Sequence, residues 1–326
     1  MPQPPDRPVV AVLCERATDR PPGLDGLGVD FRYCAADGLA DAVRGARGLM
    51  LWEYFSRAVR DVWTHADALE WIHVTAAGVD TLLFDDLRDS DVVVTNAHGI
   101  FDRPIAEYVL GAVLAHAKDS RHSFELQRQH VWQHRETRSI LDTRALVVGT
   151  GGIGRAIARL LRAAGLSVRG VGRVARADDP DFGEVIASSS LADEVGWYDH
   201  LVLAAPLTPA TRGLVNADVL AAMKPGAHLV NVARGPLVDE AALLGALRNG
   251  LGGATLDVFD TEPLPPDHPL WDAPNVTITA HMSGDVLGWR ETLAAQYADN
   301  VRRWLAGEPL LNVVDKKLGY VPGGSA

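Results

Sequence analysis

Short apolar runs alternate with polar or helix-like connections along the whole chain. In the first third, the runs lie at residues 9–13, 29–33, 48–51, 71–74 and 92–95. More runs follow at residues 145–148, 166–171, 200–204, 228–231, 254–258 and 276–279. Continuous apolar runs of this kind are typical of parallel strands that are buried on both faces and connected by helices. The pattern therefore predicts an α/β protein with two doubly wound parallel sheets, one in each part of the chain.

Helix signals lie between these runs. Asp102 and Pro104 have the positions of an N-cap region and an early-helix proline, and an apolar stripe of helical spacing continues as far as Ala117. Residues 119–142 are polar and rich in arginine and histidine, so we expect them to form a solvated face. Further helices are predicted to begin at Asn216 and Asp239, and residues 285–304 to form a long one.

One predicted strand, residues 145–148, continues directly into a glycine-rich turn and a helix. Gly149, Gly151 and Gly154 have the spacing G-x-G-x-x-G. In a nucleotide-binding βαβ unit, the first glycine permits the tight turn, the second lets a pyrophosphate approach the backbone, and the third lets the helix pack closely on the strand. The N-terminus of the helix then faces the phosphates. The flanking strands favour a dinucleotide site over an ordinary turn.

The strand that follows this helix ends in Gly172 and Arg173, about 20 residues beyond the glycines. An acidic residue in this place accepts hydrogen bonds from a free ribose 2′-hydroxyl, whereas an arginine is suited to a 2′-phosphate. Arg173 and Arg176 therefore favour NADP over NAD as the cofactor. The alternative is that both are solvated loop arginines.

The composition narrows the class of protein. The chain has 326 residues, of which 47% are hydrophobic and 22% charged, and is long enough for two domains. A net charge of −11 argues against nucleic acid or an anionic membrane as the main partner. The first residues lack the pattern of an export signal, and no apolar window reaches the length of a membrane span. Since Cys14 and Cys34 are the only cysteines, we expect a reduced, cytoplasmic protein without a metal site.

Three residues of complementary chemistry follow three different predicted strands: Arg234, Glu262 and His281. Ligands of open α/β sheets bind beyond the carboxyl ends of the strands, so these side chains should meet beside the nucleotide. A guanidinium can bind a carboxylate by two parallel hydrogen bonds, and an imidazole beside a carboxylate can donate a proton near neutral pH. Singly, each has a structural alternative: Arg234 could pair with Asp239, Glu262 could cap a loop, and His281 could be structural. The joint arrangement favours an active site.

A loop in the first third is a second candidate for substrate binding. Residues 75–80 follow a predicted strand, and the glycine lets the amides of Ala77 and Gly78 point toward a carboxylate. Taken alone, the loop is equally compatible with a plain strand-to-helix turn. Residues 52–55 either line the same cleft or cover the edge of the sheet.

Together these motifs resemble the D-isomer-specific 2-hydroxyacid dehydrogenases over nearly the whole chain. The matching segments are VTAAGVD at 74–80, VVGTGGIGRAIA at 147–158, LAAPLTPATRGLVN at 203–216, LVNVARGPLVDEAAL at 229–243, LDVFDTEPLPPDHPLW at 256–271 and TITAHMSGD at 277–285. The resemblance implies a Rossmann nucleotide-binding domain, residues 99–285, inserted in a flavodoxin-like substrate domain, residues 1–98 and 286–326. It also implies a homodimer through the nucleotide-binding domains.

The resemblance further implies roles for individual residues. Arg234, Glu262 and His281 are the implied catalytic residues, with the amides of Ala77 and Gly78 assisting Arg234 in holding the substrate carboxylate. The implied cofactor-binding residues, with Asp257 near the nicotinamide amide, are Gly149, Gly151, Gly152, Ile153, Gly154, Arg173, Arg176, Pro206, Thr208, Ala233 and Asp257. The implied reaction is hydride transfer between NAD(P)H and C2 of a small 2-oxo acid or D-2-hydroxy acid, as in glyoxylate/hydroxypyruvate reductases, with His281 as the proton donor.

Two departures from the family pattern leave questions open. Arg173 stands where NAD-using members commonly have an acidic residue, and residues 281–285, HMSGD, differ from the more usual His-x-Gly-Gly or His-x-Ala-Gly. The side chain on C2 of the substrate and the role of Trp289 are therefore not assigned. A nucleotide-sensing corepressor or interaction protein on the same fold is the alternative function. Glu262 argues against formate dehydrogenase, a relative with glutamine at this position.

Overall fold

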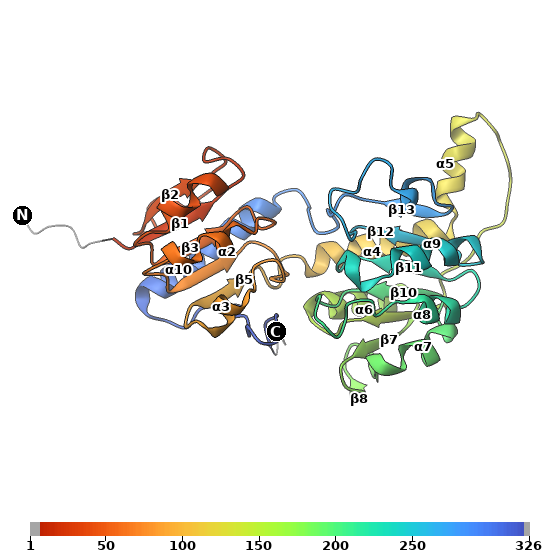
Figure 1. Ribbon diagram of the computed structural model, residues 1–326. Helices are drawn as coiled ribbons and strands as arrows, with labels where there is room; N and C mark the ends of the chain where they lie inside the picture. Colours follow the sequence, from red (N-terminus) through yellow and green to blue (C-terminus); the bar gives the residue numbers. More distant parts are fainter. Residues whose placement is uncertain (1–6, 323–326) are drawn as a thin grey trace, which may run out of the picture. The chain divides into compact units, whose positions relative to one another are not determined.

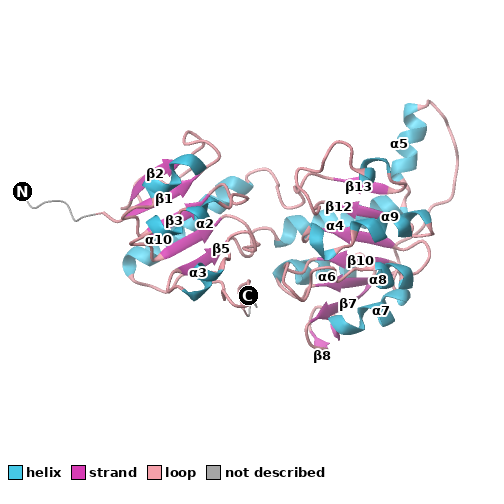
Figure 2. Cartoon of the chain, viewed as in Figure 1, coloured by secondary structure: helices cyan, strands magenta, loops and turns pink. Residues whose placement is uncertain are grey.

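The computed structural model describes residues 7–322, so the outermost residues of the predicted substrate domain, 1–6 and 323–326, lie outside the description. The chain divides into two compact units. Unit 1 comprises Met1–Ile100 and Val286–Ala326, and unit 2 comprises Phe101–Asp285. Each unit contains one β-sheet with helices beside it (Figure 1, Figure 2).

The sheet of unit 1 has the strand order β2-β1-β3-β4-β5, and all neighbouring strands are parallel. This is the strand order of the flavodoxin-like fold. The strands are β1 (Val9–Leu13), β2 (Asp30–Cys34), β3 (Gly48–Leu51), β4 (Trp71–Val74) and β5 (Val93–Asn96). The helices are α1 (Leu39–Ala42), α2 (Ala58–Asp61), α3 (Asp85–Asp89) and α10 (Trp289–Ala306). The C-terminal helix packs on this sheet, because the ring of Tyr297 stacks on Trp71 with 5.3 Å between centroids.

The sheet of unit 2 has the strand order β13-β12-β11-β10-β6-β7-β9-β8. Its neighbours are parallel except for β8 and β9, which are antiparallel. The strands are β6 (Arg144–Val148), β7 (Ser167–Gly172), β8 (Arg176–Asp179), β9 (Gly183–Ala187), β10 (His200–Leu203), β11 (His228–Asn231), β12 (Gly253–Leu256) and β13 (Val276–Ile278). The chain reverses its direction of winding at β6, as in a Rossmann sheet. The predicted fold class is therefore confirmed for both parts of the chain.

The helices of unit 2 are α4 (Asp102–Ala117), α5 (Ser120–Arg128), α6 (Gly152–Ala163), α7 (Leu191–Glu194), α8 (Ala217–Ala222) and α9 (Glu240–Arg248). Two of them, α8 and α9, begin at the capping residues that the sequence contains. The side chain of Asn216 accepts a hydrogen bond from the Val219 amide, and that of Asp239 accepts one from the Ala242 amide. Both side chains satisfy amides that have no partner inside the helix, as predicted.

Two features of unit 2 differ from the sequence-based picture. Strands β8 and β9 lie between β7 and β10 in the chain, where no strand was predicted. Strand β8 is polar and lies at the edge of the sheet, so it lacks the apolar run of a buried strand. Within residues 119–142, expected only as a solvated face, the structure forms α5 and a long segment after it, which stand out from the sheet in Figure 1.

Burial favours the protonated form of the two cysteine thiols. Cys14 and Cys34 are free, buried thiols, and burial raises their pKa values to about 12 and about 11. A thiol that stays protonated is a poor nucleophile and a poor metal ligand.

No helix between residues 7 and 322 is long and apolar enough to cross a lipid bilayer.

Candidate active site

The glycine-rich turn after β6 has a conformation that only glycine permits at two positions. Gly149 has a φ of +108°, and a Cβ built there would lie 2.6 Å from the carbonyl carbon of Ala204. A Cβ on Gly154 would lie 1.9 Å from the carbonyl oxygen of Gly149. The turn, the start of α6 and the loop after β10 therefore pack backbone against backbone.

The middle glycine of the motif differs from the other two. A Cβ on Gly151 would meet no atom of the described chain within 4 Å, so packing inside the protein does not require glycine there. Gly151 is the exposed N-cap of α6, and Gly152 and Ile153 begin the helix. An open approach to the first turn of a helix is what a pyrophosphate needs. The residues present therefore fit a dinucleotide cofactor.

The loop after β10 contributes the next predicted cofactor residues. Pro206 is exposed and Thr208 is half-buried. The hydroxyl of Thr211 donates to the carbonyl of Pro206 (2.7 Å) and accepts from the amide of Thr208 (2.8 Å). Thr211, which the sequence analysis did not single out, thus closes the turn that positions both residues.

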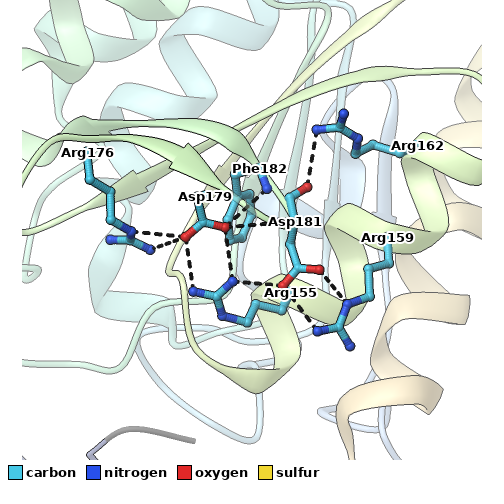
Figure 3. Close-up of polar contacts among 7 residues, drawn as sticks. All are labelled: Arg155, Arg159, Arg162, Arg176, Asp179, Asp181 and Phe182. Carbon is cyan, nitrogen blue, oxygen red and sulfur yellow. Dashed lines mark hydrogen bonds and ion pairs between the residues drawn. The ribbon is translucent and has the colours of Figure 1, made fainter. Parts of the chain in front are cut away.

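The two arginines predicted to favour NADP lie beyond β7. Both are exposed. Arg173 follows directly after the last residue of β7, and Arg176 begins β8. The guanidinium of Arg176 donates to Asp179 through Nε (3.0 Å) and Nη2 (2.8 Å), as Figure 3 shows. Arg176 is therefore held by a carboxylate that the sequence analysis did not identify.

The strand ends of β11, β12 and β13 hold the predicted catalytic residues. These strands are neighbours in the sheet. Nδ1 of His281 lies 2.7 Å from Oε2 of Glu262, and each side chain is a little over a quarter exposed (28% and 29%). The pair is thus partly shielded from solvent yet accessible to a small ligand. The structure brings the predicted acid and its carboxylate partner together.

Glu262 is fixed from two sides. Its second oxygen, Oε1, accepts a hydrogen bond from the amide of Phe259 (2.9 Å). Burial raises the pKa of Glu262, but the hydrogen bonds from His281 and Phe259 and the charge of Arg234 outweigh burial and hold the pKa below its usual value. Glu262 therefore remains a carboxylate near neutral pH and can orient the His281 ring. Glu262 also caps its own loop through the Phe259 amide, so one side chain both caps the loop and binds His281.

Arg234 lies in the loop that follows β11. The side chain of Asn231 shapes this loop, since its Nδ2 donates to the carbonyl of Arg234 (3.0 Å) and its Oδ1 accepts from the amide of Ala233 (3.1 Å). A Cβ on Gly235 would lie 1.9 Å from the carbonyl carbon of Phe259. Gly235 thus lets the Arg234 loop pack against the loop that carries Glu262. The carboxylate of Asp239, the alternative partner of Arg234, caps α9.

The comparisons with known proteins agree with this geometry. Residues 110–283 match the family model described as D-isomer specific 2-hydroxyacid dehydrogenase, NAD binding domain. The chain belongs to the D-isomer specific 2-hydroxyacid dehydrogenases. It is therefore an NAD(P)-dependent enzyme that acts on 2-hydroxy or 2-oxo acids.

Individual members of this family resemble the chain along most of its length. A D-isomer specific 2-hydroxyacid dehydrogenase from Xanthobacter autotrophicus Py2, solved in complex with NADPH and MES, is 35% identical with a TM-score of 0.81, covering 95% of this chain and 99% of that one. An NADPH-dependent glyoxylate/hydroxypyruvate reductase from Sinorhizobium meliloti is 28% identical with a TM-score of 0.80, covering 97% and 100%. A (S)-sulfolactate dehydrogenase from Chromohalobacter salexigens is 34% identical, covering 77% and 82%.

In this 2-hydroxyacid dehydrogenase, Asp257, predicted to line the cofactor site, has a side chain that is buried inside a loop. Its carboxylate is fully buried and accepts hydrogen bonds from the Thr279 hydroxyl (2.6 Å) and the amides of Met282 and Ser283 (2.9 Å each). The backbone carbonyl of Asp257 accepts from the His281 amide (2.8 Å). His281 has a φ of +51°, a strained conformation for a non-glycine residue. Asp257 therefore holds the loop that carries His281.

Tyr108 of α4 extends this hydrogen-bond chain and was missed by the sequence analysis. Its hydroxyl lies 2.6 Å from the hydroxyl of Thr279. Burial raises the pKa of Tyr108 to about 12, so the hydroxyl stays protonated. A tyrosine in an amphipathic helix carries no sequence signal for such a role, because its partner is 171 residues away in the chain.

In unit 1, residues 75–80 form a half-buried loop after β4. The Thr75 hydroxyl donates to the carbonyl of Leu51 (2.7 Å), and Nδ2 of Asn96 donates to the carbonyl of Ala77 (2.6 Å). Asn96, at the end of β5, was not identified from the sequence. These bonds fix the loop at its first residue and at Ala77, and Ala77 and Gly78 are half-buried. Trp52, after β3, is buried.

Proposed function

We propose that this enzyme reduces a small 2-oxo acid of the glyoxylate or hydroxypyruvate type with NADPH. The observation that carries the proposal is the 2.7 Å pair of His281 and Glu262, with Arg234 in the adjoining loop. An oriented imidazole and a guanidinium are the two groups that reduction of a 2-oxo acid requires from the protein.

The residues divide the work as follows. The bound dinucleotide supplies the hydride that reduces C2. Because Nδ1 of His281 is bonded to Glu262, we propose that Nε2 donates the proton to the oxygen that becomes the hydroxyl. Arg234 binds the substrate carboxylate and thereby fixes the face of C2 that is presented. In unit 1, we propose the amides of Ala77 and Gly78 as substrate-binding groups.

The same proposal assigns unit 2 as the nucleotide-binding domain and unit 1 as the substrate domain. The pyrophosphate would lie against Gly151, Gly152 and Ile153, with the open approach at Gly151. Pro206, Thr208, Ala233 and Asp257 complete the proposed cofactor-binding set. Because its carboxylate is buried, Asp257 would contribute by holding the loop that carries His281.

NADPH is the proposed reductant because Arg173 and Arg176 follow β7, where a 2′-phosphate would lie. Two structures similar to this chain contain NADPH or NADP. The test is Arg173→Asp, with kcat/KM measured for NADPH and NADH at one ionic strength. We expect the wild type to prefer NADPH by about tenfold or more, and the variant to lose or reverse that preference. An NADH preference that the variant leaves unchanged would exclude this role.

The substrate class is tested by a panel of 2-oxo acids. Glyoxylate, hydroxypyruvate, pyruvate, phenylpyruvate and 3-sulfopyruvate should each be assayed with NADPH. We expect glyoxylate or hydroxypyruvate to give the highest kcat/KM. A higher value for 3-sulfopyruvate would point instead to the specificity of the sulfolactate relative, and turnover of none would favour an interaction protein on this fold.

We also propose a homodimer formed through unit 2. The segment around α5 carries apolar side chains that a monomer would leave in water: Phe124 is 64% exposed and Trp132 is fully exposed. Sedimentation equilibrium should give twice the monomer mass for the wild type and a lower mass for Phe124→Glu/Trp132→Glu. A monomeric wild type would exclude the dimer.

A further inference from the structure

A network of arginines and aspartates joins α6 to the β8–β9 connection. Figure 3 shows Arg155 and Arg159 of α6 reaching Asp179 and Asp181, with Arg176 on the far side of Asp179. Three guanidinium groups bind the two carboxylates, and a fourth, that of Arg162, donates to the backbone carbonyl of Asp181 (3.3 Å). The proposed function uses only Arg176 of this network and gives no role to the two buried carboxylates.

Asp179 is the most completely held of these residues. Its side chain is 2% exposed. The carboxylate accepts two hydrogen bonds from Arg155 (3.0 and 3.1 Å) and two from Arg176 (3.0 and 2.8 Å). The amides of Asp181 and Phe182 donate to it as well (3.1 and 3.3 Å). A carboxylate with this many donors has one position and one rotamer.

The ionisation of Asp179 follows from the same contacts. Burial would raise its pKa, but the hydrogen bonds from Arg155, Arg176 and the two amides outweigh burial and hold the pKa well below its usual range. Asp179 therefore carries a full negative charge at every pH at which a dehydrogenase is assayed. Its hold on Arg176 does not depend on pH in that range.

Arg176 is held by one edge of its guanidinium. Asp179 binds Nε and Nη2. The remaining nitrogen, Nη1, lies 3.6 Å from the Cβ position of Gly172, and the Thr150 hydroxyl lies 3.6 Å from that same position. Nη1 is thus next to the end of β7 and the glycine-rich turn, where the adenosine ribose of a Rossmann cofactor lies.

We propose that Asp179 is a positioning residue for cofactor selectivity, which holds Arg176 so that Nη1 presents its hydrogens to the 2′-phosphate of NADP. The guanidinium of Arg155 and the backbone amides of Asp181 and Phe182 fix Asp179 from behind. This inference rests on the proposed NADPH preference. It assigns the preference to a guanidinium whose orientation is set before the cofactor binds, so that little side-chain entropy is lost on binding.

Burial distinguishes this role from that of the acidic residue in NAD-using enzymes. A carboxylate that binds ribose hydroxyls must be exposed to the ligand, whereas the side chain of Asp179 is covered and its oxygens already accept six hydrogen bonds. Asp179 therefore acts through Arg176 and not on the ribose.

The experiment is Asp179→Asn, read as the ratio of kcat/KM for NADPH to kcat/KM for NADH. Asparagine has nearly the same shape, but its amide NH₂ cannot accept from Arg176. We expect the ratio to fall about tenfold through a higher KM for NADPH, with the NADH values changed less than about twofold. A residue that only stabilised the fold would change both cofactors together, so an unchanged ratio in a folded variant would overturn the proposal.

Asp181→Asn is the matched control. Asp181 binds Arg155 and Arg159, so this variant removes a buried carboxylate from the same network without removing the one that holds Arg176. We expect its NADPH to NADH ratio to stay within about twofold of the wild type. A fall equal to that of Asp179→Asn would show that the charge of the network, and not the position of Arg176, sets selectivity.

Arg176→Lys keeps the test decisive if Asp179→Asn does not fold. Residue 176 is exposed, and lysine preserves the charge but cannot bind Asp179 by one edge while presenting another nitrogen. We expect a fall in the ratio close to that of Arg176→Ala, and retention of the wild-type ratio would overturn the inference. Failure of the proposed function gives a different result, since the wild type itself would then show no preference for NADPH.

Discussion

Two charged clusters in unit 2 differ in how they are built. His281 and Glu262 are partly exposed and joined by one hydrogen bond. The loop of His281 is held by the buried carboxylate of Asp257, which accepts from backbone amides, and the loop of Glu262 packs against the backbone at Gly235. The network around Asp179 is held by side-chain ion pairs with a nearly covered carboxylate. The difference matches the proposed tasks, because a group that transfers a proton must reach its ligand, whereas a group that positions another needs only to stay charged and still.

Removal of the proton donor should break the first cluster most severely. We expect His281→Ala to lower kcat about 10²-fold to 10⁴-fold with nearly unchanged cofactor affinity, the range for loss of a positioned general acid. Steady-state kinetics and NADPH titration by fluorescence give both quantities.

His268→Ala is the matched control for that variant. His268 also pairs with a carboxylate, its Nε2 lying 3.3 Å from Glu240, but it does not follow a strand end of the sheet. Its kcat should remain within about threefold of the wild type. An equal loss in both variants would mean that general damage to unit 2, and not proton donation, explains the effect.

Arg234→Lys tests whether geometry or charge matters at the carboxylate-binding position. A lysine keeps the charge but lacks the planar fork, so we expect KM for the 2-oxo acid to rise about tenfold or more and kcat to fall less. The KM values of the substrate and of NADPH should be measured separately. A change confined to cofactor KM would remove Arg234 from the substrate site.

Gly154→Ala should disturb the helix α6, which carries Arg155 and Arg159 of the second cluster. The added Cβ would lie 1.9 Å from the carbonyl of Gly149, so the helix must shift away from the turn, at about 1–3 kcal/mol. We expect weaker binding of NADPH and NADH alike and a lower melting temperature. Gly111→Ala in α4 is the control, because an added Cβ there would meet no atom within 4 Å. We expect it to leave cofactor binding and the melting temperature unchanged or slightly improved.

The pH dependence of stability should differ between variants of Asp179 and Glu262, by less than the effects above. Both Asp179 and Glu262 have pKa values lowered in the folded protein, so their contributions to stability are present above the unfolded pKa of about 4 and are lost as the pH falls through the folded pKa. We expect urea midpoints to fall between pH 6 and pH 3, less steeply in Asp179→Asn than in Glu262→Gln, because Glu262 is more exposed. Identical slopes in the two variants would contradict the comparison.

Much of the fold follows from local pattern. The apolar runs of β1, β3, β4 and β11 were placed at their observed ends, because a parallel strand buried on both faces must be apolar throughout. The glycine spacing and the cap at Asn216 were likewise readable, since each reflects a backbone requirement within a few residues. The meeting of His281 and Glu262 was predicted only by combining strand ends with a family resemblance.

What the sequence by itself determined was thus the strand and helix pattern, the glycine-rich turn and the residues able to do acid–base and carboxylate chemistry. The tertiary structure alone decided the pairing of Asp179 with Arg155 and Arg176, the chain from Tyr108 to Asp257, and the packing of Gly235 against Phe259. Apart from Arg176 and Asp179, which both lie in β8, these contacts join residues from elements or loops that are far apart in the chain. A single polar residue in a loop or a helix has no periodic signal, because its partner is chosen by how the elements pack and not by its neighbours in the chain.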